Sequence, residues 1–184
     1  NAIIADIRDK NRISRIFRDE KPDLVFHAAA LKHVPIVEAH PTEGILTNIN
    51  GTRIIADCCH AIGVSAMVLI STDKAVNPTN IMGATKRLAE LSLQGFQDLE
   101  DNQTCFSMVR FGNVLNSSGS VVPLFWDQIS SGGPVTVTHK EVNRFFMTIE
   151  EASSLVIKSS SIAKGGEVFL LDMGSPIKIK NLAE

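Results

Sequence analysis

The clearest hydrophobic run in the chain lies near its centre, at residues 67–70. It is short, it contains two β-branched residues, and four polar residues follow it directly, so it predicts a strand covered on both faces. A turn at Asn77 and Pro78 comes next, and the apolar residues then take helical spacing. Met82 and Lys86 are four residues apart, so they share one face of this helix.

The remaining apolar patterns predict strands and helices in alternation. Strand-like stretches occur at residues 2–7, 24–26, 105–111, 135–138 and 167–172. Helical stretches begin after residue 9 and after a loop at 116–120, and others span about 41–62, 82–99 and 147–163. We expect strand 24–26 to be buried and strand 2–7 to end at Asp6. Strands that alternate with helices are typical of an α/β protein.

Length and charge exclude several classes of protein. The 184 residues suit one domain with a sizeable core, and they include 18 basic and 20 acidic side chains. This balance argues against a nucleic-acid partner or an anionic membrane surface. No apolar run approaches the ~20 residues that a membrane span needs, and the first residues do not form a signal peptide.

Cysteine and histidine spacing predicts neither a disulfide framework nor a metal site. Adjacent Cys58 and Cys59 could form a redox pair, but small buried hydrophobic residues in a reducing compartment fit the sequence better. Cys105 leaves the number odd. The five histidines lack the spacing of metal ligands, so we predict no metal.

Polar groups gather where the central strand is predicted to end. Thr72, Asp73 and Lys74 follow the apolar run, and Lys86 comes from the next helix. In an open α/β sheet, ligands bind at the carboxyl ends of the strands. Asp73 and Lys74 also form an adjacent acid–base pair suited to proton transfer. We therefore predict a functional site here.

Five segments together resemble the extended short-chain dehydrogenases, specifically nucleotide-sugar 4,6-dehydratases of the capsule and O-antigen type. They are KPDLVFHAAALKHVPIVE, TNINGT, STDKAVNPTNIMGATKRLAE, VRFGNVLNSSGSVVPLF and NRFFMTIEEA, and the similarity covers nearly all of the chain. The usual pattern in the third segment is Tyr-x-x-x-Lys, whereas this chain has Met82 and Lys86 and contains no tyrosine. Because it has methionine in this position, the chain resembles the long, membrane-anchored branch of the dehydratases.

The resemblance implies a Rossmann-like doubly wound parallel sheet with a small C-terminal substrate-binding portion. It also implies that an N-terminal βαβ unit with its glycine-rich loop is missing, since the chain begins without methionine and lacks G-x-G-x-x-G. We expect one truncated domain, in which residues 1–115 form a partial dinucleotide-binding core. Residues 116–184 would then form an interleaved nucleotide-sugar-binding portion.

The same resemblance implies which residues meet each ligand. The cofactor is NAD(P), with NAD favoured, and its expected contacts are Asp6, Ile7, Ala28, Ala29, Ala30, Lys32, Asn48, Lys86 and Phe111. The expected contacts of the sugar nucleotide are Lys32, His33, Asn113, Val121, Val122, Thr136, Thr138 and Arg144. The expected catalytic group consists of Thr72, Asp73, Lys74, Met82 and Lys86.

Several of these positions also have a purely structural explanation. Asp6 could cap a helix or end a strand, and the alanines at 28–30 could serve tight packing. His33 could be a loop histidine, and Arg144 a surface arginine. The loop at 116–120, whose amides favour an anion before a helix, could instead be capped without a ligand. Ordinary β-propensity explains the two threonines equally well.

For catalysis, the resemblance implies oxidation at C4, water elimination across C5 and C6, and hydride return to C6. Asp73 is the expected acid for the C6 oxygen and Lys74 the base at C5, while Thr72 bonds the C4 oxygen. Lys86 would hold the nicotinamide ribose. A thioether cannot accept the C4 proton, so the base is Asp73 or a water bridged to Lys86. The alternative is that Met82 is simply part of the helix core and that the site has lost its catalytic function.

The expected substrate is UDP-N-acetylglucosamine, used in surface polysaccharide synthesis. We expect a homo-oligomer at the cytoplasmic face of the inner membrane, with membrane attachment only through a segment outside this chain. Two other functions fit the same architecture. One is a nucleotide-sugar epimerase or reductase, which would not need Asp73 and Lys74. The other is a non-catalytic dinucleotide-binding module, which leaves that pair unexplained.

Overall fold

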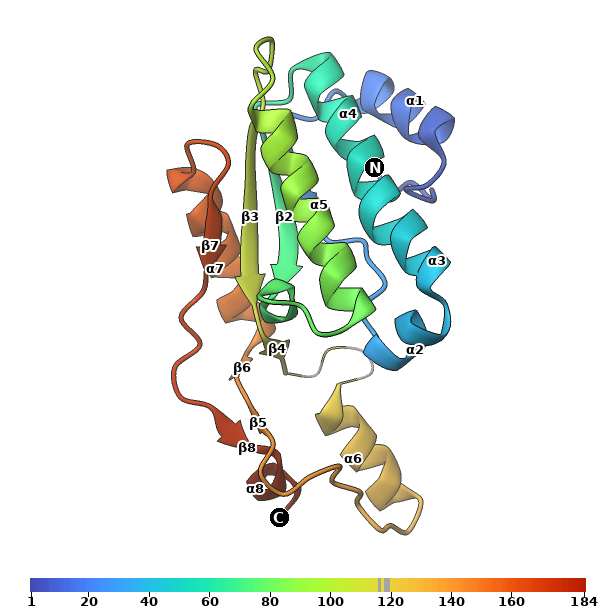
Figure 1. The fold of residues 1–184 in the computed structure, drawn as a ribbon, viewed down its shortest axis with the longest axis vertical. Helices are drawn as coiled ribbons and strands as arrows, with labels where there is room; N and C mark the ends of the chain where they lie inside the picture. Colours follow the sequence, from blue (N-terminus) through green and yellow to red (C-terminus); the bar gives the residue numbers. More distant parts are fainter. Residues whose placement is uncertain (116, 118–119) are drawn as a thin grey trace. The chain divides into compact units, whose positions relative to one another are not determined.

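The structure is a computed structural model that describes residues 1–115, 117 and 120–184 (Figure 1). These residues form two compact units. The first contains residues 1–110 and 159–170, and the second contains residues 111–158 and 171–184.

A four-stranded parallel sheet forms the centre of the first unit, in the order β1-β2-β3-β7. The strands are β1 (Leu24–His27), β2 (Ala66–Thr72), β3 (Cys105–Phe111) and β7 (Val168–Leu170). Met67, Val68 and Leu69 are fully buried, which confirms the prediction that this strand is covered on both faces. Because the strands are parallel, the carboxyl ends of β1 and β2 lie at the same edge of the sheet.

Three long helices belong to the first unit. They are α1 (Lys10–Glu20), α4 (Thr52–Ile62) and α5 (Ile81–Gln97). The Asn80 side chain accepts a hydrogen bond from the Gly83 N–H (2.8 Å) and so caps α5, while Gly63 ends α4 with φ of 68°. Figure 1 shows α4 and α5 side by side, with α5 next to β2, and α1 packs on α4.

The core of the first unit lies between these helices and the sheet. It combines apolar residues of α1, α4, α5, β2 and β3, which are Ile13, Phe17, Ile55, Ala56, Met67, Leu69, Ala89, Leu93, Phe106 and Met108, with Cys58, Cys59 and Val64. Cys58 and Cys59 are buried free thiols, which confirms the interpretation of them as small core residues.

The predicted helix over 41–62 is confirmed, but its middle is a π-helix. It consists of α3 (Pro41–Gly44), the π-helical η1 (Ile45–Gly51) and α4, and the shorter α2 (Val34–Ala39) precedes it. A π-turn inserts one extra residue per turn and often occurs at functional sites. The apolar spacing of the sequence does not reveal this change.

Two predicted strands are wrong. Residues 2–7 form no strand: Ile4 is exposed, and the Asp6 carbonyl accepts the Asp9 N–H (3.0 Å) in a turn that leads into α1. Residues 135–138 form none either, because the Gln128 side chain accepts the N–H of Thr136 (3.0 Å) and donates to its hydroxyl (2.7 Å). In both places, a residue nearby in the sequence forms a hydrogen bond with a backbone group that a neighbouring strand would otherwise bond.

The prediction that strand 24–26 is buried is also wrong in part. Leu24 is 45% exposed and Phe26 43% exposed. Leu24 and Phe26 are two residues apart in β1, so their side chains lie on the same face of the sheet. That face is uncovered in the described structure, and β1 is an edge strand. An apolar run alone does not distinguish an edge strand from a central one.

The second unit contains short elements. In it β4 (Asn113–Val114) pairs in parallel with β6 (Phe146–Met147), and β5 (Asn143–Arg144) pairs antiparallel with β8 (Ile177–Lys178). Its helices are α6 (Val121–Ser130), α8 (Ile179–Ala183) and most of α7 (Ile149–Ile162). Among the described residues, no helix combines the length and the apolar character that a membrane span requires.

Candidate functional site

The polar residues at the end of β2 form a hydrogen-bonded cluster. Thr72 is the last residue of the strand, and Asp73 and Lys74 begin the 3₁₀ turn η2 (Asp73–Ala75). One oxygen of Asp73, Oδ1, accepts from the Thr72 hydroxyl (2.9 Å) and from Lys74 Nζ (2.9 Å). The Asp73 and Lys74 side chains remain 41% and 33% exposed. The pair is therefore oriented and accessible to a ligand.

The start of α5 packs directly against this turn. A Cβ placed on Gly83 would lie 2.2 Å from the Lys74 carbonyl oxygen, so only glycine permits this approach. Glu38 accepts the N–H of Ile81 (2.6 Å) and fixes the same helix end. The first turn of α5 and the acid–base pair therefore lie next to each other, as the sequence predicts.

Lys86 is buried, with 6% of its surface exposed, and its Nζ donates to the carbonyl of Ile70 in β2 (2.6 Å). Burial lowers the pKa of Lys86 to about 8, while the negative charge of Glu90 opposes this shift. Lys86 therefore lies close to the strand end that carries Thr72. Its ammonium also titrates nearer to neutral pH than that of an ordinary lysine.

Met82 is core, with 3% of its surface exposed. Its carbonyl accepts from the Thr85 hydroxyl (2.7 Å), one turn further along α5. A thioether neither gives nor takes a proton at neutral pH. In this structure Met82 therefore acts by packing, and a catalytic role for it remains a prediction.

Asn48 connects three segments around the predicted cofactor position. Its side chain accepts the N–H of Leu31 (2.8 Å), donates to the Leu31 carbonyl (2.9 Å), and donates to the Thr85 hydroxyl (2.9 Å). The π-helix is thereby fastened both to α5 and to the loop that follows Ala28, Ala29 and Ala30. Asn48 is buried, so these bonds form away from solvent.

His27, at the end of β1, was not predicted as a site residue. Its Nε2 lies 3.0 Å from the hydroxyl of Thr52, which itself donates to the Asn48 carbonyl (2.7 Å). Since that hydroxyl has a single proton, Nε2 of His27 must be the donor. Burial, and then the charge of Lys86, lower the pKa of His27 to about 4, so the ring is neutral. The sequence signal that could have identified His27 as a site residue is its position directly before Ala28, Ala29 and Ala30.

Asp6 and Ile7 lie at the beginning of the chain. Asp6 is exposed and ion-paired to Arg8 (2.6 Å), which also bonds Glu43 (2.7 Å). The hydrogen bonds from Arg8 lower the pKa of Asp6 to about 2. Ile7 packs on Gly51 of the π-helix, where a Cβ would meet its side chain at 2.5 Å. Asp6 therefore stays ionised and exposed.

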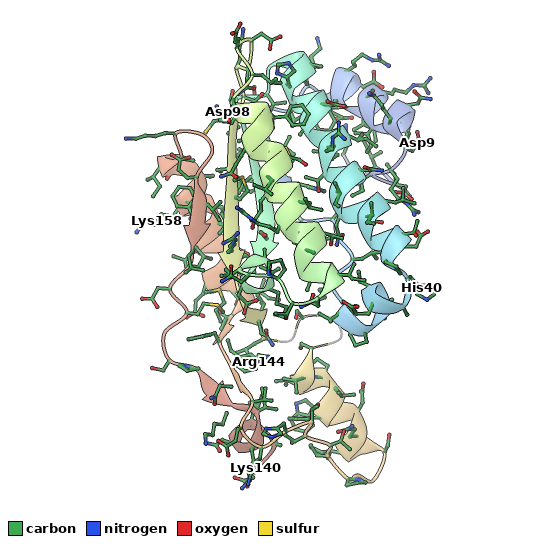
Figure 2. The ribbon with its side chains drawn as sticks, viewed as in Figure 1. Asp9, His40, Asp98, Lys140, Arg144 and Lys158 are labelled. Carbon is green, nitrogen blue, oxygen red and sulfur yellow. The ribbon has the colours of Figure 1, made fainter. Side chains whose placement is uncertain are left out.

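The other predicted residues are more scattered. Lys32 is exposed and His33 half-buried, just before α2, and Phe111 ends β3. The expected sugar-nucleotide residues after position 110 belong to the second unit: Asn113 in β4, Val121 and Val122 in α6, Thr136 and Thr138 in a loop, and Arg144 in β5. Arg144 is exposed and donates to the Asn143 carbonyl (2.9 Å; Figure 2). Residues 116, 118 and 119 of the predicted anion loop lie outside the described residues.

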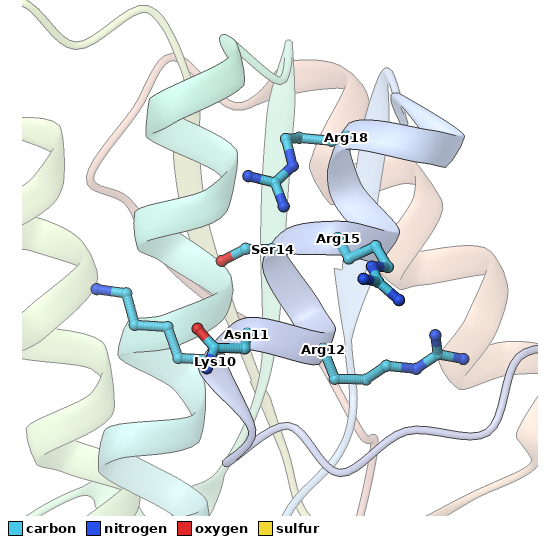
Figure 3. A pocket seen from close by; sticks show the side chains of 6 residues that line it. All are labelled: Lys10, Asn11, Arg12, Ser14, Arg15 and Arg18. Carbon is cyan, nitrogen blue, oxygen red and sulfur yellow. The ribbon is translucent and has the colours of Figure 1, made fainter.

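A basic hollow lies on α1, and its lining includes none of the predicted site residues. Its lining consists of Lys10, Asn11, Arg12, Ser14, Arg15 and Arg18 (Figure 3). In the described part of the chain, no group of three or more histidine, cysteine, aspartate or glutamate side chains is placed to hold a metal ion.

The parallel sheet, its helices and the polar cluster at the strand end define a Rossmann-like α/β protein. Comparison with known proteins refines this class. A family described as polysaccharide biosynthesis protein matches residues 1–184. The chain belongs to the polysaccharide biosynthesis protein family.

Three curated relatives show the range of this similarity. The capsular polysaccharide biosynthesis protein CapD of Staphylococcus aureus is 56% identical over 182 residues, which are 99% of this chain and 30% of CapD. UDP-N-acetylglucosamine 4,6-dehydratase (inverting) of Campylobacter jejuni is 42% identical over 98% of this chain and 54% of the relative. UDP-glucose 4-epimerase of Rickettsia canadensis is 37% identical over 91% of this chain and 49% of the relative.

Solved structures confirm the fold. Pen from Bacillus thuringiensis has a TM-score of 0.94 and 41% identity, covering 100% of this chain and 56% of Pen. DesIV, a dTDP-glucose 4,6-dehydratase from Streptomyces venezuelae with NAD and DAU bound, has a TM-score of 0.89 at 20% identity, covering 97% and 60%. The chain spans between 30% and 60% of the length of these five proteins.

Proposed function

We propose that this chain is the core of a NAD-dependent UDP-N-acetylglucosamine 4,6-dehydratase that serves surface polysaccharide synthesis. The observation that carries the proposal is the bonding of Asp73 Oδ1 to both Thr72 and Lys74 at an accessible strand end. A carboxyl group and an amine held this close together could act on neighbouring atoms of one ligand, which supports the proposal. The 42% identity to a protein with that name, over nearly the whole chain, supports the same substrate and reaction.

The residues present fit a dinucleotide. Ala28 and Ala29 are exposed and Ala30 is half-buried at the end of β1, so small side chains leave space for a flat ring. Asp6 and Ile7 would meet the adenosine half, and Lys86 the nicotinamide ribose. When bound, NAD supplies the hydride acceptor that oxidation at C4 requires.

The proposed proton transfers balance over one turnover. Asp73 accepts the C4 hydroxyl proton as the C4 hydride leaves, and Thr72 donates to the resulting C4 oxygen. Lys74 removes the C5 proton, while Asp73 passes its proton to the C6 oxygen, which departs as water. NAD, when bound, would supply the hydride acceptor at C4 and the hydride donor at C6. Lys74 returns a proton to C5, so both residues regain their starting states.

In this scheme Met82 has no chemical step, because Asp73 takes the proton that tyrosine would take elsewhere in the superfamily. The alternative acceptor is a water bridged to Lys86. Asp73→Asn distinguishes the two. If Asp73 is the acceptor, the variant forms no reduced cofactor with substrate; if water is the acceptor, reduced cofactor accumulates without dehydration.

The contacts of the sugar nucleotide are proposed from the resemblance, residue by residue. We propose that Arg144 bonds the diphosphate, since a guanidinium offers several donors in a fixed fork. Asn113, Val121, Val122, Thr136 and Thr138 would line the nucleotide, with Lys32 and His33 near the sugar. A homo-oligomer at the cytoplasmic membrane face, attached through a segment outside this chain, completes the proposal.

A product assay tests the function. The whole protein, including the parts beyond this chain, is incubated with UDP-N-acetylglucosamine and NAD and analysed by mass spectrometry and NMR. A 4-keto-6-deoxy product lighter by one water supports the dehydratase. A C4 epimer of unchanged mass would instead establish the epimerase that the Rickettsia relative suggests. Bound cofactor without turnover would establish a binding module.

A further inference from the structure

A second charged cluster lies behind the strand end, and its centre is Glu90. This carboxylate has 0% of its surface exposed. Its Oε1 accepts from the Ser71 hydroxyl (2.6 Å) and from Arg110 Nε (2.8 Å). Its Oε2 accepts from Arg87 Nη1 (3.0 Å) and from Arg110 Nη2. Four hydrogen bonds from three side chains hold one buried anion.

These bonds join the elements that carry the proposed active site. Glu90 lies one turn after Lys86 on α5, and Ser71 immediately precedes Thr72. Two consecutive residues of β2 are therefore bonded to two successive turns of α5: the Ile70 carbonyl to Lys86, and Ser71 to Glu90. Arg110 adds the end of β3 to the same anion. The arrangement fixes the register of α5 against the strand end.

We propose that Glu90 is a positioning residue for Lys86: it holds the lysine against the end of β2 and keeps its ammonium charged in a buried position. This inference rests on the proposed function, in which Lys86 holds the cofactor. It assigns Glu90 a role beyond packing, because removing the anion changes the charge state of a site residue.

Charges near Lys86 support this role. Burial raises the pKa of Glu90, but the hydrogen bonds from Arg110, Ser71 and Arg87 outweigh it and lower the pKa, so the carboxylate is ionised at neutral pH. His27, the titratable group of β1 that interacts with Lys86, is neutral there. The groups of η1 and α4 beside His27 are the uncharged Asn48 and Thr52. Glu90 therefore supplies the negative charge that offsets the desolvation of Lys86.

The test measures the titration of Lys86 itself, so it does not depend on turnover. Lysines of the whole protein are labelled with ¹³C at Cε, and the Lys86 signal is identified by its loss in Lys86→Gln. In Glu90→Gln, the titration midpoint of Lys86 should fall by about one pH unit or more, because an anion is lost. In Arg110→Gln, it should rise, because a competing cation near Glu90 is removed while the anion remains.

If Glu90 had only a structural role, the Lys86 midpoint would not shift in opposite directions in Glu90→Gln and Arg110→Gln. Ser71→Ala, which removes a hydrogen bond without a charge, is the matched control and should leave the midpoint nearly unchanged. If Glu90→Gln does not fold, Arg110→Gln and Glu90→Asp replace it, and Glu90→Asp should keep the midpoint near that of the wild type. Unchanged midpoints in folded charge variants would overturn the proposal.

The same variants separate this inference from the proposed function. If the wild-type protein lacks dehydratase activity but the midpoints shift as expected, the function fails and the positioning of Lys86 by Glu90 stands. If dehydration occurs and the midpoints do not move, the function stands and the positioning role fails.

Discussion

Individual side chains around β2 are held by bonds between residues that lie far apart in the sequence. Asn48 bonds Leu31 and Thr85, and His27 bonds Thr52. Sequence reasoning placed Asp73 and Lys74 together because they are adjacent. It did not predict His27 or Glu90, since a histidine at a strand end and a glutamate on a helix are usually explained by packing or by solvent exposure.

Met82 provides the first test at this scale. Because its side chain is buried and has no exchangeable proton, Met82→Leu should cost less than about 1.5 kcal/mol of unfolding free energy. Turnover of UDP-N-acetylglucosamine should stay within about tenfold of the wild type, since no proton passes through the thioether. Urea unfolding and product formation measure the two quantities. A much larger loss of turnover at unchanged stability would show that the sulfur takes part in the reaction.

His27 predicts a pH dependence of stability. Its pKa is about 4 in the folded protein and 6.5 in its ordinary state, so the unfolded chain binds the proton more tightly between these values. Stability from this residue is therefore fully present above 6.5 and is lost as the pH falls towards 4. Between pH 7 and pH 5 the wild type should lose about 2 kcal/mol more than His27→Gln.

Urea unfolding at both pH values measures this difference. Glutamine is chosen because its amide can still donate to Thr52 Oγ1 but does not titrate. Equal losses in the two proteins would mean that His27 does not titrate as a buried neutral ring.

At the scale of elements, the strand–turn–helix from β2 to α5 was predicted well. Its apolar run, the Asn77-Pro78 turn and the helical spacing are all local signals. The strands expected at 2–7 and 135–138 failed because a strand also requires a partner, and in both places nearby polar groups take the backbone bonds. The π-helical segment was missed because apolar spacing does not distinguish it from an α-helix; its Asn48 bonds Leu31 and Thr85.

Two glycines of α5 form a matched pair for testing how the helix meets the turn. In Gly83→Ala, the new methyl group would meet the Lys74 carbonyl oxygen at 2.2 Å, so the helix start must move. We expect a loss of about 1–3 kcal/mol and a loss of turnover, because the acid–base pair is displaced. Gly95 has no atom within 4 Å of such a group, so Gly95→Ala should gain up to about 1 kcal/mol.

Thermal or urea unfolding and the dehydration assay compare the two variants directly. Similar effects of both substitutions would contradict the close approach of α5 to Lys74. A stable Gly83→Ala protein with full turnover would contradict it as well.

At the scale of the whole molecule, sequence patterns identified an α/β protein, and the resemblance identified the family. The proposed catalytic residues all lie within one strand–turn–helix, so local sequence signals were enough to predict that they lie close together. The proposed sugar-nucleotide residues are harder to predict, because those after position 110 come from short elements of the second unit with weak periodicity. Their assignment rests on resemblance, because topology alone does not narrow the range of chemistry that this fold supports.

The most direct test of the central claim, that Lys74 is the base at C5, is deuterium incorporation. The whole protein is incubated with UDP-N-acetylglucosamine in heavy water, and the position of deuterium in the product is determined by NMR. The wild type and the surface control Lys10→Ala should give a dehydrated product with deuterium at C5, and Lys74→Ala should give none. Dehydration with deuterium at C5 in a folded Lys74→Ala protein would contradict the account.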